Sequence, residues 1–210
     1  MVDEADREAF LAARNVSRET LQRLDTYAML LRKWNPAINL VSRTTLADLW
    51  SRHFLDSAQL LDRTPNSASN WVDLGSGGGF PGLIVAILAA EAAPHLRVTL
   101  VESDARKAAF LLRVAQATET PAEVKIARAE TLAPQSADVL SARALAPLDR
   151  LLPLAQRHLA EDGIALFPKG AGHAEEIDAA LASWAFRVQK HPSITDPSGV
   201  ILEIGGIARV

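Results

Sequence analysis

The first third of the chain is organised by apolar residues that recur at helical spacing. Five of them, three or four positions apart, form an apolar stripe along one helix face. They are Leu21, Leu24, Ala28, Leu31 and Trp34. Because proline disfavours helix in the residue before it, Asn35-Pro36 ends the pattern. The spacing predicts a helix over 18–34.

A second apolar run repeats this spacing after Thr44, a residue type that is suited to cap a helix. Its members are Leu46, Leu49, Trp50, Phe54, Ala58 and Leu61. Residues 64–70 then read TPNSASN, and such small and polar residues interrupt regular structure. We therefore expect residues 1–63 to form an N-terminal helical lobe and residues 64–70 to be a linker.

From residue 71 onward, short apolar runs alternate with helical stretches, a pattern typical of βαβ units with a parallel sheet. Strands are predicted at 71–74, 97–102, 123–127, 138–142 and 163–167, and helices at 80–91, 104–117, 148–160 and 173–182. Two further runs, 184–190 and 200–207, are joined by a loop with proline and glycine and predict an antiparallel hairpin. Residues 71–210 are thus expected to form an α/β domain, with a mostly parallel sheet and flanking helices.

A glycine-rich segment separates the first predicted strand from the next helix, since residues 71–82 read WVDLGSGGGFPG. Glycines there let backbone N–H groups and a helix N-terminus meet a nucleotide-like ligand without obstruction from Cβ atoms. The register GxGxxG (Gly77, Gly79, Gly82) is the dinucleotide fingerprint, whereas DxGxGxG (Asp73, Gly75, Gly77, Gly79) is typical of S-adenosylmethionine-dependent methyltransferases. The second register fits better, because the tight turn belongs at Gly75. In addition, Asp73 suits a cationic ammonium or sulfonium group and not a pyrophosphate.

Acidic residues follow the next two predicted strands. Glu102 ends the strand RVTLVE beside the glycine loop and can accept hydrogen bonds from two vicinal ribose hydroxyls. Such an acid serves NAD and S-adenosylmethionine equally well. Ala129 and Glu130 follow the third strand at the same edge of the sheet, where an adenine base could lie. Position alone favours a surface loop for this pair.

Composition narrows the possible chemistry. The chain has no cysteine, and its five histidines show no metal-ligand spacing, so neither thiol nor metal chemistry is expected. The N-terminus is too polar for a signal peptide, and the apolar run 83–93 is far shorter than the ~20 residues of a membrane span, which predicts a cytoplasmic protein without membrane contact. The formal net charge is −3, so any RNA contact must be local.

Several segments give the chain a specific resemblance to a known family. They are WNPAINLVS at 34–42, RHFLDS at 52–57, VDLGSGGGFPG at 72–82, VESDARKAAFL at 101–111, RAE at 128–130, SARALAPL at 141–148 and FPKG at 167–170. With these segments, in this order, the chain resembles the ribosomal RNA small subunit methyltransferase G family, also called glucose-inhibited division protein B. It departs from that family at Glu102, where many relatives have Asp, and over 184–210, which match only in pattern.

The resemblance implies a Rossmann-like class I methyltransferase sheet with an N-terminal helical extension, and S-adenosylmethionine as the cofactor. It also implies that the methyl acceptor is N7 of a guanine in 16S ribosomal RNA, presented as RNA or within the small ribosomal subunit. The family's cofactor-binding positions correspond here to Gly75, Phe80, Ala129, Glu130 and Arg143. We expect the chain to act as a monomer.

Four basic residues are candidates for contact with the substrate. Arg143 ends a predicted strand at the edge that carries the glycine loop, where an arginine is costly unless it serves a ligand or partner. Arg52 and His53 lie about one turn from Asp56, so their default interpretation is a helix-surface ion pair. Lys169 follows the fifth strand, where a solvated lysine in a turn is an equally good interpretation.

No side chain is predicted to act as a general base, because guanine N7 carries a lone pair and no proton. Holding the acceptor in line with the methyl group can supply ~7–11 kcal/mol of the barrier. Two other functional classes stay open. One is an NAD-dependent oxidoreductase, which the GxGxxG register and Glu102 allow, and the other is a nucleotide-binding module without catalysis.

Overall fold

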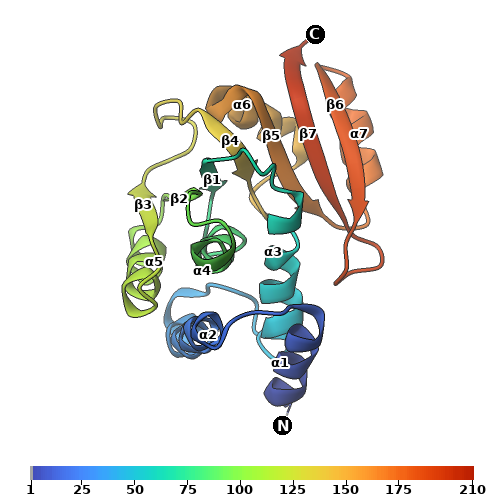
Figure 1. Cartoon of the computed structure of the whole chain (residues 1–210). Helices are drawn as coiled ribbons and strands as arrows, with labels where there is room; N and C mark the ends of the chain where they lie inside the picture. Colours follow the sequence, from blue (N-terminus) through green and yellow to red (C-terminus); the bar gives the residue numbers. More distant parts are fainter. Residues whose placement is uncertain (1) are drawn as a thin grey trace.

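A computed structural model describes residues 2–210 of the chain, with side chains from residue 4 onward. Seven strands form one sheet in the order β3-β2-β1-β4-β5-β7-β6 (Figure 1). They are β1 (Asn70–Leu74), β2 (Arg97–Glu102), β3 (Ala122–Ile126), β4 (Ala137–Ser141), β5 (Leu159–Lys169), β6 (Trp184–Pro192) and β7 (Val200–Arg209). The first five are parallel to one another, and β7 is antiparallel to both of its neighbours. The predicted mostly parallel sheet with an antiparallel C-terminal hairpin is confirmed.

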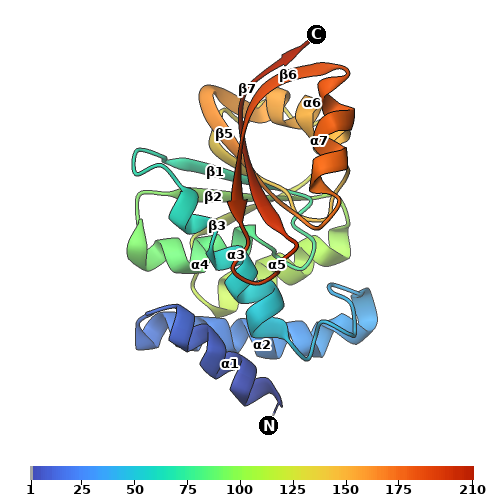
Figure 2. The same cartoon turned by 90° about the vertical axis from the view of Figure 1, so that its right-hand side faces the viewer.

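Helices cover both faces of this sheet (Figure 2). They are α1 (Val2–Ala13), α2 (Arg18–Ile38), the π-helical turn η1 (Trp50–Leu55), α3 (Asp56–Ala58), the 3-10 turn η2 (Leu61–Arg63), α4 (Gly82–Ala92), α5 (Ala105–Ala117), α6 (Leu148–His158) and α7 (His173–Leu181). On one face, α4 and α5 pack against the strands, and α1 and α2 form a further layer beyond them. On the other face, α6 packs against β4 and β5, and α7 against β6.

Alternation along β1 divides the buried side chains between two cores. Trp71 packs with the α4 and α5 side, whereas Val72 and Leu74 pack with the α6 side. The N-terminal helices add Tyr27 and Phe54 to the first of these cores, so they bury apolar surface against α4 and α5. The division into a lobe at 1–63, a linker at 64–70 and a domain at 71–210 stays a prediction.

Helix α2 runs beyond the end that the sequence pattern predicts. It continues through Pro36 to Ile38, and Asn39 then adopts a left-handed conformation that ends it. The expected end at residue 34 is therefore wrong. The exposed Pro36 removes one backbone donor, while the buried side chain of Asn35 accepts hydrogen bonds from the N–H groups of Leu40 and Val41 and stabilises the turn that follows.

The second N-terminal helical run also differs from its prediction. Residues 42–48 form turns, and regular structure begins near Trp50. Thr44 is not the cap; instead, the Asp6 carboxylate of α1 accepts hydrogen bonds from the backbone N–H groups of Trp50 at 2.7 Å and Ser51 at 3.1 Å. Helix α1 has no counterpart among the elements predicted from the sequence. Its contact with η1 fixes the segment that carries Arg52 and His53.

The topology opens a crevice between β1 and β4. From β1 the chain builds β2 and β3 on one side, and β4 then pairs with the opposite edge of β1. In sheets of this kind, ligands bind outside the carboxyl ends of the strands where the order reverses. The glycine loop follows β1 and Arg143 follows β4, so the topology brings both to this crevice.

Candidate active site

Three glycines of the loop after β1 have backbone angles that explain the motif. Gly75, Gly77 and Gly79 have φ values of +66°, +55° and +97°, in the region that glycine adopts without penalty. Two neighbouring elements fix the loop. The N–H groups of Gly75 and Ser76 donate hydrogen bonds to the carbonyl of Val101 in β2 at 2.8 and 3.1 Å. The hydroxyl of Tyr27 in α2 donates to the carbonyl of Gly78.

Asp73 lies beneath this loop and not in front of a ligand. Its side chain is fully buried on the α4 side of β1, where it accepts hydrogen bonds from the N–H of Gly82 at 3.2 Å and the hydroxyl of Ser141 at 2.7 Å. Burial raises the pKa of Asp73 to about 6, against the lowering effect of these hydrogen bonds. The expectation that Asp73 directly attracts a cationic ligand group does not match this position. In the structure Asp73 ties the loop to the start of α4.

Glu102 fixes the loop from the neighbouring strand. One carboxylate oxygen accepts from the N–H of Gly77 and the other from the N–H of Asp104, each at 2.8 Å. The residue is 7% exposed. Since each carboxylate oxygen can accept two hydrogen bonds, these contacts leave capacity for a ligand. The role of Glu102 as a ribose clamp stays a prediction.

Ala129 and Glu130 lie after β3, two strands away from β1. Ala129 is buried, and its carbonyl accepts a hydrogen bond from Nε2 of the buried His158 at 2.8 Å, which anchors this turn to the end of α6. Glu130 is exposed. Neither residue lines the cavity at the glycine loop, so their predicted contact with an adenine base stays a prediction.

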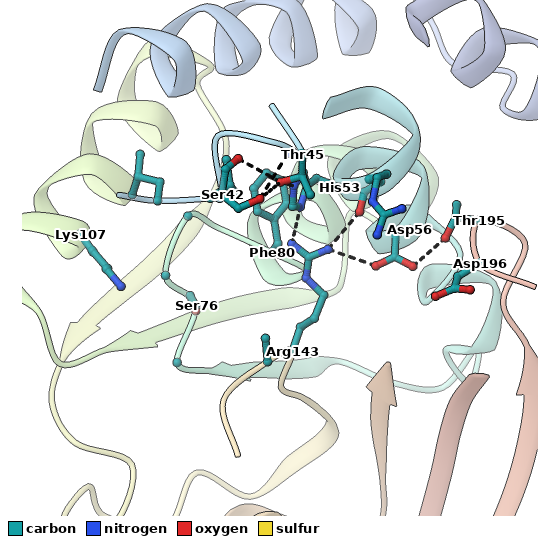
Figure 3. A pocket seen from close by; sticks show the side chains of 17 residues that line it. Ser42, Thr45, His53, Asp56, Ser76, Phe80, Lys107, Arg143, Thr195 and Asp196 are labelled. Atoms are coloured by element: carbon teal, nitrogen blue, oxygen red, sulfur yellow. Dashed lines mark hydrogen bonds and ion pairs between the residues drawn. The ribbon is translucent and has the colours of Figure 1, made fainter. Parts of the chain in front are cut away.

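A cavity of about 480 Å³ opens above the glycine loop, and we call it the loop cavity (Figure 3). Gly75, Gly77 and Phe80 line it from the loop, and Arg143 lines it from the segment after β4. The exposed Arg52 reaches the same cavity from η1. The structure therefore brings together predicted site residues from three separate parts of the chain.

The guanidinium of Arg143 makes hydrogen bonds to three residues of the cavity wall and a cation–π contact to a fourth. Its Nη1 donates to the carboxylate of Asp56 at 3.1 Å and to the carbonyl of Arg52 at 3.2 Å, and its Nη2 lies 2.7 Å from Nδ1 of His53. The guanidinium also lies over the Phe80 ring, with its carbon 5.0 Å from the centroid. Asp56 thus pairs with Arg143, and the interpretation of a helix-surface pair with Arg52 or His53 is wrong.

His53 is buried between Arg143, Phe80 and Thr45, and only 8% of its surface is exposed. Its ring stacks on Phe80 at a centroid distance of 4.9 Å, and its Nε2 lies 2.9 Å from the hydroxyl of Thr45. Burial, together with the nearby charges of Arg143 and Arg52, lowers the pKa of His53 to about 3. His53 is therefore uncharged at neutral pH.

A second cavity, of about 550 Å³, adjoins the loop cavity. The two share Arg143 and Asp56, which lie on the boundary between them. Lys169 lines the second cavity, with its Nζ donating to the carbonyl of Ala146 at 2.9 Å and to the Glu176 carboxylate at 2.7 Å. Its side chain is 9% exposed, so Lys169 is not the solvated turn lysine of the alternative interpretation.

The hairpin loop at 193–199 adds site residues that the sequence analysis missed. Thr195 donates to the Asp56 carboxylate at 2.9 Å, and Asp196 lines both cavities. Gln59 holds this loop, because its side-chain oxygen accepts from the N–H of Ile194 at 3.0 Å. Proline and glycine identified the segment as a loop, but no local signal showed that it contacts Asp56 of α3 and Gln59, the residue that follows this helix.

Two negative findings apply to residues 2–210. None of the helices in this range combines the length with the hydropathy that a membrane span requires. Nor do His, Asp or Glu side chains of the described residues gather in a group of three or more that could hold a metal ion.

Sequence comparison shows to which family the chain is similar. Residues 20–201 match the family described as rRNA small subunit methyltransferase G. A relative from Ruegeria sp. (strain TM1040), named Ribosomal RNA small subunit methyltransferase G, is 54% identical over 196 residues, which cover 93% of this chain and 95% of the relative. A relative of the same name from Rhodospirillum centenum is 56% identical over 199 residues, covering 95% and 90%.

Solved structures with low sequence identity share the fold. A TehB-like SAM-dependent methyltransferase from Corynebacterium glutamicum aligns with a TM-score of 0.55 and 16% identity, over 89% of this chain and 97% of that one. A putative S-adenosyl-L-methionine-dependent methyltransferase from Methanococcus maripaludis aligns with a TM-score of 0.58 and 10% identity, over 91% and 95%. The fold is thus that of class I methyltransferases. By the extent and identity of the sequence matches, the chain belongs to the rRNA small subunit methyltransferase G family.

Proposed function

We propose that this chain transfers the methyl group of S-adenosylmethionine to N7 of a guanine in 16S ribosomal RNA. Family membership and the class I methyltransferase fold support the reaction class. The observation that carries the proposal is the pair of adjoining cavities that share Arg143, one above the glycine loop and the other beside Lys169. A methyl donor and a methyl acceptor must approach each other closely, and two cavities with a common boundary allow this.

The glycine loop fits the cofactor. A Cβ added to Gly77 would meet nothing nearer than the carbonyl of Gly75 at 3.7 Å, so the face of Gly77 is open toward the cavity. S-adenosylmethionine, when bound, supplies an electrophilic methyl group on a sulfonium centre. The residues that would hold it are Asp73, Gly75, Gly77, Gly79, Phe80, Glu102, Ala129, Glu130 and Arg143. Of these, Asp73 would act indirectly, because its carboxylate accepts a hydrogen bond from the N–H of Gly82 and so supports the loop.

The acceptor base would occupy the second cavity, with N7 toward the shared boundary. Arg143 and Lys169 line this cavity, and both carry donors that suit the oxygen or phosphate groups of a nucleotide. Because N7 has a free lone pair, the chain's own residues need only bind and orient the base. Neither His53, which is uncharged, nor the paired carboxylate of Asp56 is needed to remove a proton.

Recognition of the RNA would depend on shape and on a few local cations. The net charge of −3 gives little general attraction to a polyanion. Arg52 and Lys107 line the loop cavity from η1 and α5, where they can meet the phosphates near the target guanine. A structured acceptor, such as the small ribosomal subunit, would supply the rest of the specificity.

The NAD alternative is less compatible with this fold. Dinucleotide-binding sheets have the order 3-2-1-4-5-6, whereas here the antiparallel strand β7 lies between β5 and β6. The other alternative, a module that binds the cofactor without catalysis, has the same fold and the same cofactor as an active methyltransferase. Only an assay of methyl transfer distinguishes the two.

The test compares small-subunit RNA from cells with and without this protein. Borohydride and aniline cleavage detects 7-methylguanine, and purified protein with labelled S-adenosylmethionine should restore the missing site. Calorimetry with S-adenosylhomocysteine and with NAD tests the cofactor separately. Methylation confined to an adenine, a ribose or a protein would refute the acceptor, and tight binding of NAD alone would refute the cofactor.

A further inference from the structure

The contacts of His53 determine its protonation and tautomer. The guanidinium of Arg143 can only donate hydrogen bonds, so Nδ1 of His53, 2.7 Å from Nη2, must carry a lone pair. A neutral imidazole carries one proton, which then lies on Nε2 and is donated to the hydroxyl of Thr45 at 2.9 Å. The hydroxyl of Thr45 in turn lies 2.9 Å from that of Ser42. His53 is thus neutral and protonated on Nε2.

We propose that His53 is a positioning residue for methyl transfer, which as a neutral imidazole holds the Arg143 guanidinium at the boundary between the two cavities. This inference rests on the proposed function for its kinetic readout. It replaces the expectation that His53 itself contacts the substrate. The stacking of the imidazole on Phe80 fixes the plane of the ring, and Thr45 fixes its tautomer.

The network leaves Arg143 partly free for a ligand. Three of its five N–H groups are used by Arg52, Asp56 and His53. Within residues 2–210, the Nε–H and one N–H on Nη2 have no protein acceptor, and the side chain lines both cavities. The protein contacts therefore set the direction of the remaining donors. Without the acceptor at His53, Asp56 and the carbonyl of Arg52 hold only one end of the guanidinium.

The surroundings of His53 keep it neutral. Arg143 faces it from the segment after β4, and Arg52 adjoins it on η1. Asp56 of α3 is paired with Arg143, while Lys107 of α5 and Asp196 of the hairpin loop line the same cavity. A proton on Nδ1 would place two cations in contact in a buried site. His53 can therefore accept a hydrogen bond from Arg143 at neutral pH.

Two substitutions at His53 distinguish the effect of losing the hydrogen-bond acceptor from the effect of losing the volume of the imidazole ring. His53→Leu removes the acceptor, and His53→Asn keeps an oxygen near the position of Nδ1. We expect His53→Leu to lower kcat/KM for methyl transfer by about 10- to 100-fold, the value of a hydrogen bond to a charged group. His53→Asn should recover most of this loss. His95→Leu, at an exposed histidine, is the matched control and should leave kcat/KM unchanged.

A double-mutant cycle distinguishes positioning from direct contact. If His53 acts through Arg143, His53→Leu should change kcat/KM by less than about twofold in an Arg143→Ala background. Effects that multiply in the double variant would overturn the inference. The same cycle is measured on S-adenosylhomocysteine binding by calorimetry, a readout that does not require an RNA acceptor.

Nitrogen NMR of the unmodified protein tests the inference without any variant of the site. In protein labelled at histidine, the His53 signals should show the Nε2–H tautomer and no titration between pH 5 and 9, with His95→Leu helping the assignment. An Nδ1–H tautomer, or titration near pH 6.5, overturns the inference even if methyl transfer is observed. Absence of methyl transfer by the native protein would refute the proposed function, while the NMR result and the binding cycle would still decide the role of His53.

Discussion

Asp73 accepts a hydrogen bond at 3.2 Å from the backbone N–H of Gly82, nine residues further along the chain. The contact joins the end of β1 to the first residue of α4 and closes the glycine loop between them. It also explains the glycine, because a Cβ at residue 82 would lie 2.5 Å from the Cβ of Asp73. The carboxylate that the sequence motif assigns to the ligand is thus part of the loop's support.

The buried Asp73 predicts a pH dependence of stability. Its pKa of about 6 in the folded protein exceeds the ordinary value, so between about pH 4 and pH 6 the folded state binds more protons than the unfolded state. This group's contribution is therefore greatest at low pH and is lost as the pH rises through 6, with a difference on the order of 3 kcal/mol. Asp73→Asn should remove this loss, as measured by urea unfolding at pH 4.5 and 7.5. Asp178→Asn, at an exposed site on α7, should retain the native dependence.

A side chain at position 77 is predicted to interfere with cofactor binding, and a larger side chain to do so more strongly. Its positive φ costs another residue about 1 kcal/mol or more, and any Cβ enters the open face of the loop. Gly77→Val should abolish S-adenosylhomocysteine binding in calorimetry, while Gly77→Ala should weaken it. Gly172→Ala, at an open position with an ordinary backbone angle, is the control. Full affinity in Gly77→Val would contradict the role of the loop.

Glu102 is predicted to increase the affinity for the cofactor, because its two carboxylate oxygens are held in place by the backbone N–H groups of Gly77 and Asp104. Glu102→Gln places an amide N–H₂ against one of the backbone donors, Gly77 or Asp104, and so loses a charge-assisted hydrogen bond. The Kd for S-adenosylhomocysteine should rise about tenfold or more. The exposed Glu175→Gln serves as the matched control and should bind like the native protein. Equal affinities for both variants would exclude Glu102 from the cofactor site.

Arg143→Ala should change both activity and the titration of His53. Loss of the guanidinium removes a cation beside the imidazole, so the pKa of His53 should rise above its native value of about 3. It should stay below 6.5, because burial is the larger cause of the shift. Methyl transfer should fall by about 100-fold or more, given that a charged group fixed at a reacting boundary is lost. Arg150→Ala, on the exposed side of α6, should change neither quantity.

The absence of a general base predicts a flat pH profile for single-turnover methyl transfer above neutrality. The pKa of His53 is lowered to about 3 and that of Asp73 is raised to about 6, so both lie below the range from pH 7 to 8.5. The rate should vary by less than about twofold across this range if no proton is removed by a side chain. A rise governed by a single pKa within this window would show that a base takes part after all.

The sequence by itself determined the elements and the loop. The spacing of apolar residues predicts the strands and most of the helices. An element that is buried on one face has apolar residues at a regular short spacing, which can be recognised within a short stretch of sequence. The glycine motif is local in the sequence too, since Gly75, Gly77 and Gly79 lie within five consecutive residues, and all three have a positive φ. Hence the α/β fold, the C-terminal hairpin and the family resemblance were accessible from the residues in order.

Only the tertiary structure decided what the polar side chains contact. Arg143 meets His53 across 90 positions and Asp56 across 87, and Thr195 reaches Asp56 across 139. No local pattern encodes such pairs, because they arise when separate elements pack against one sheet edge. Asp73 likewise points into the core because its place on β1 faces α4, and a charged residue type alone does not reveal that direction. The local spacing of apolar residues thus determines the helices and strands, whereas packing between distant segments determines the polar contacts of the candidate active site.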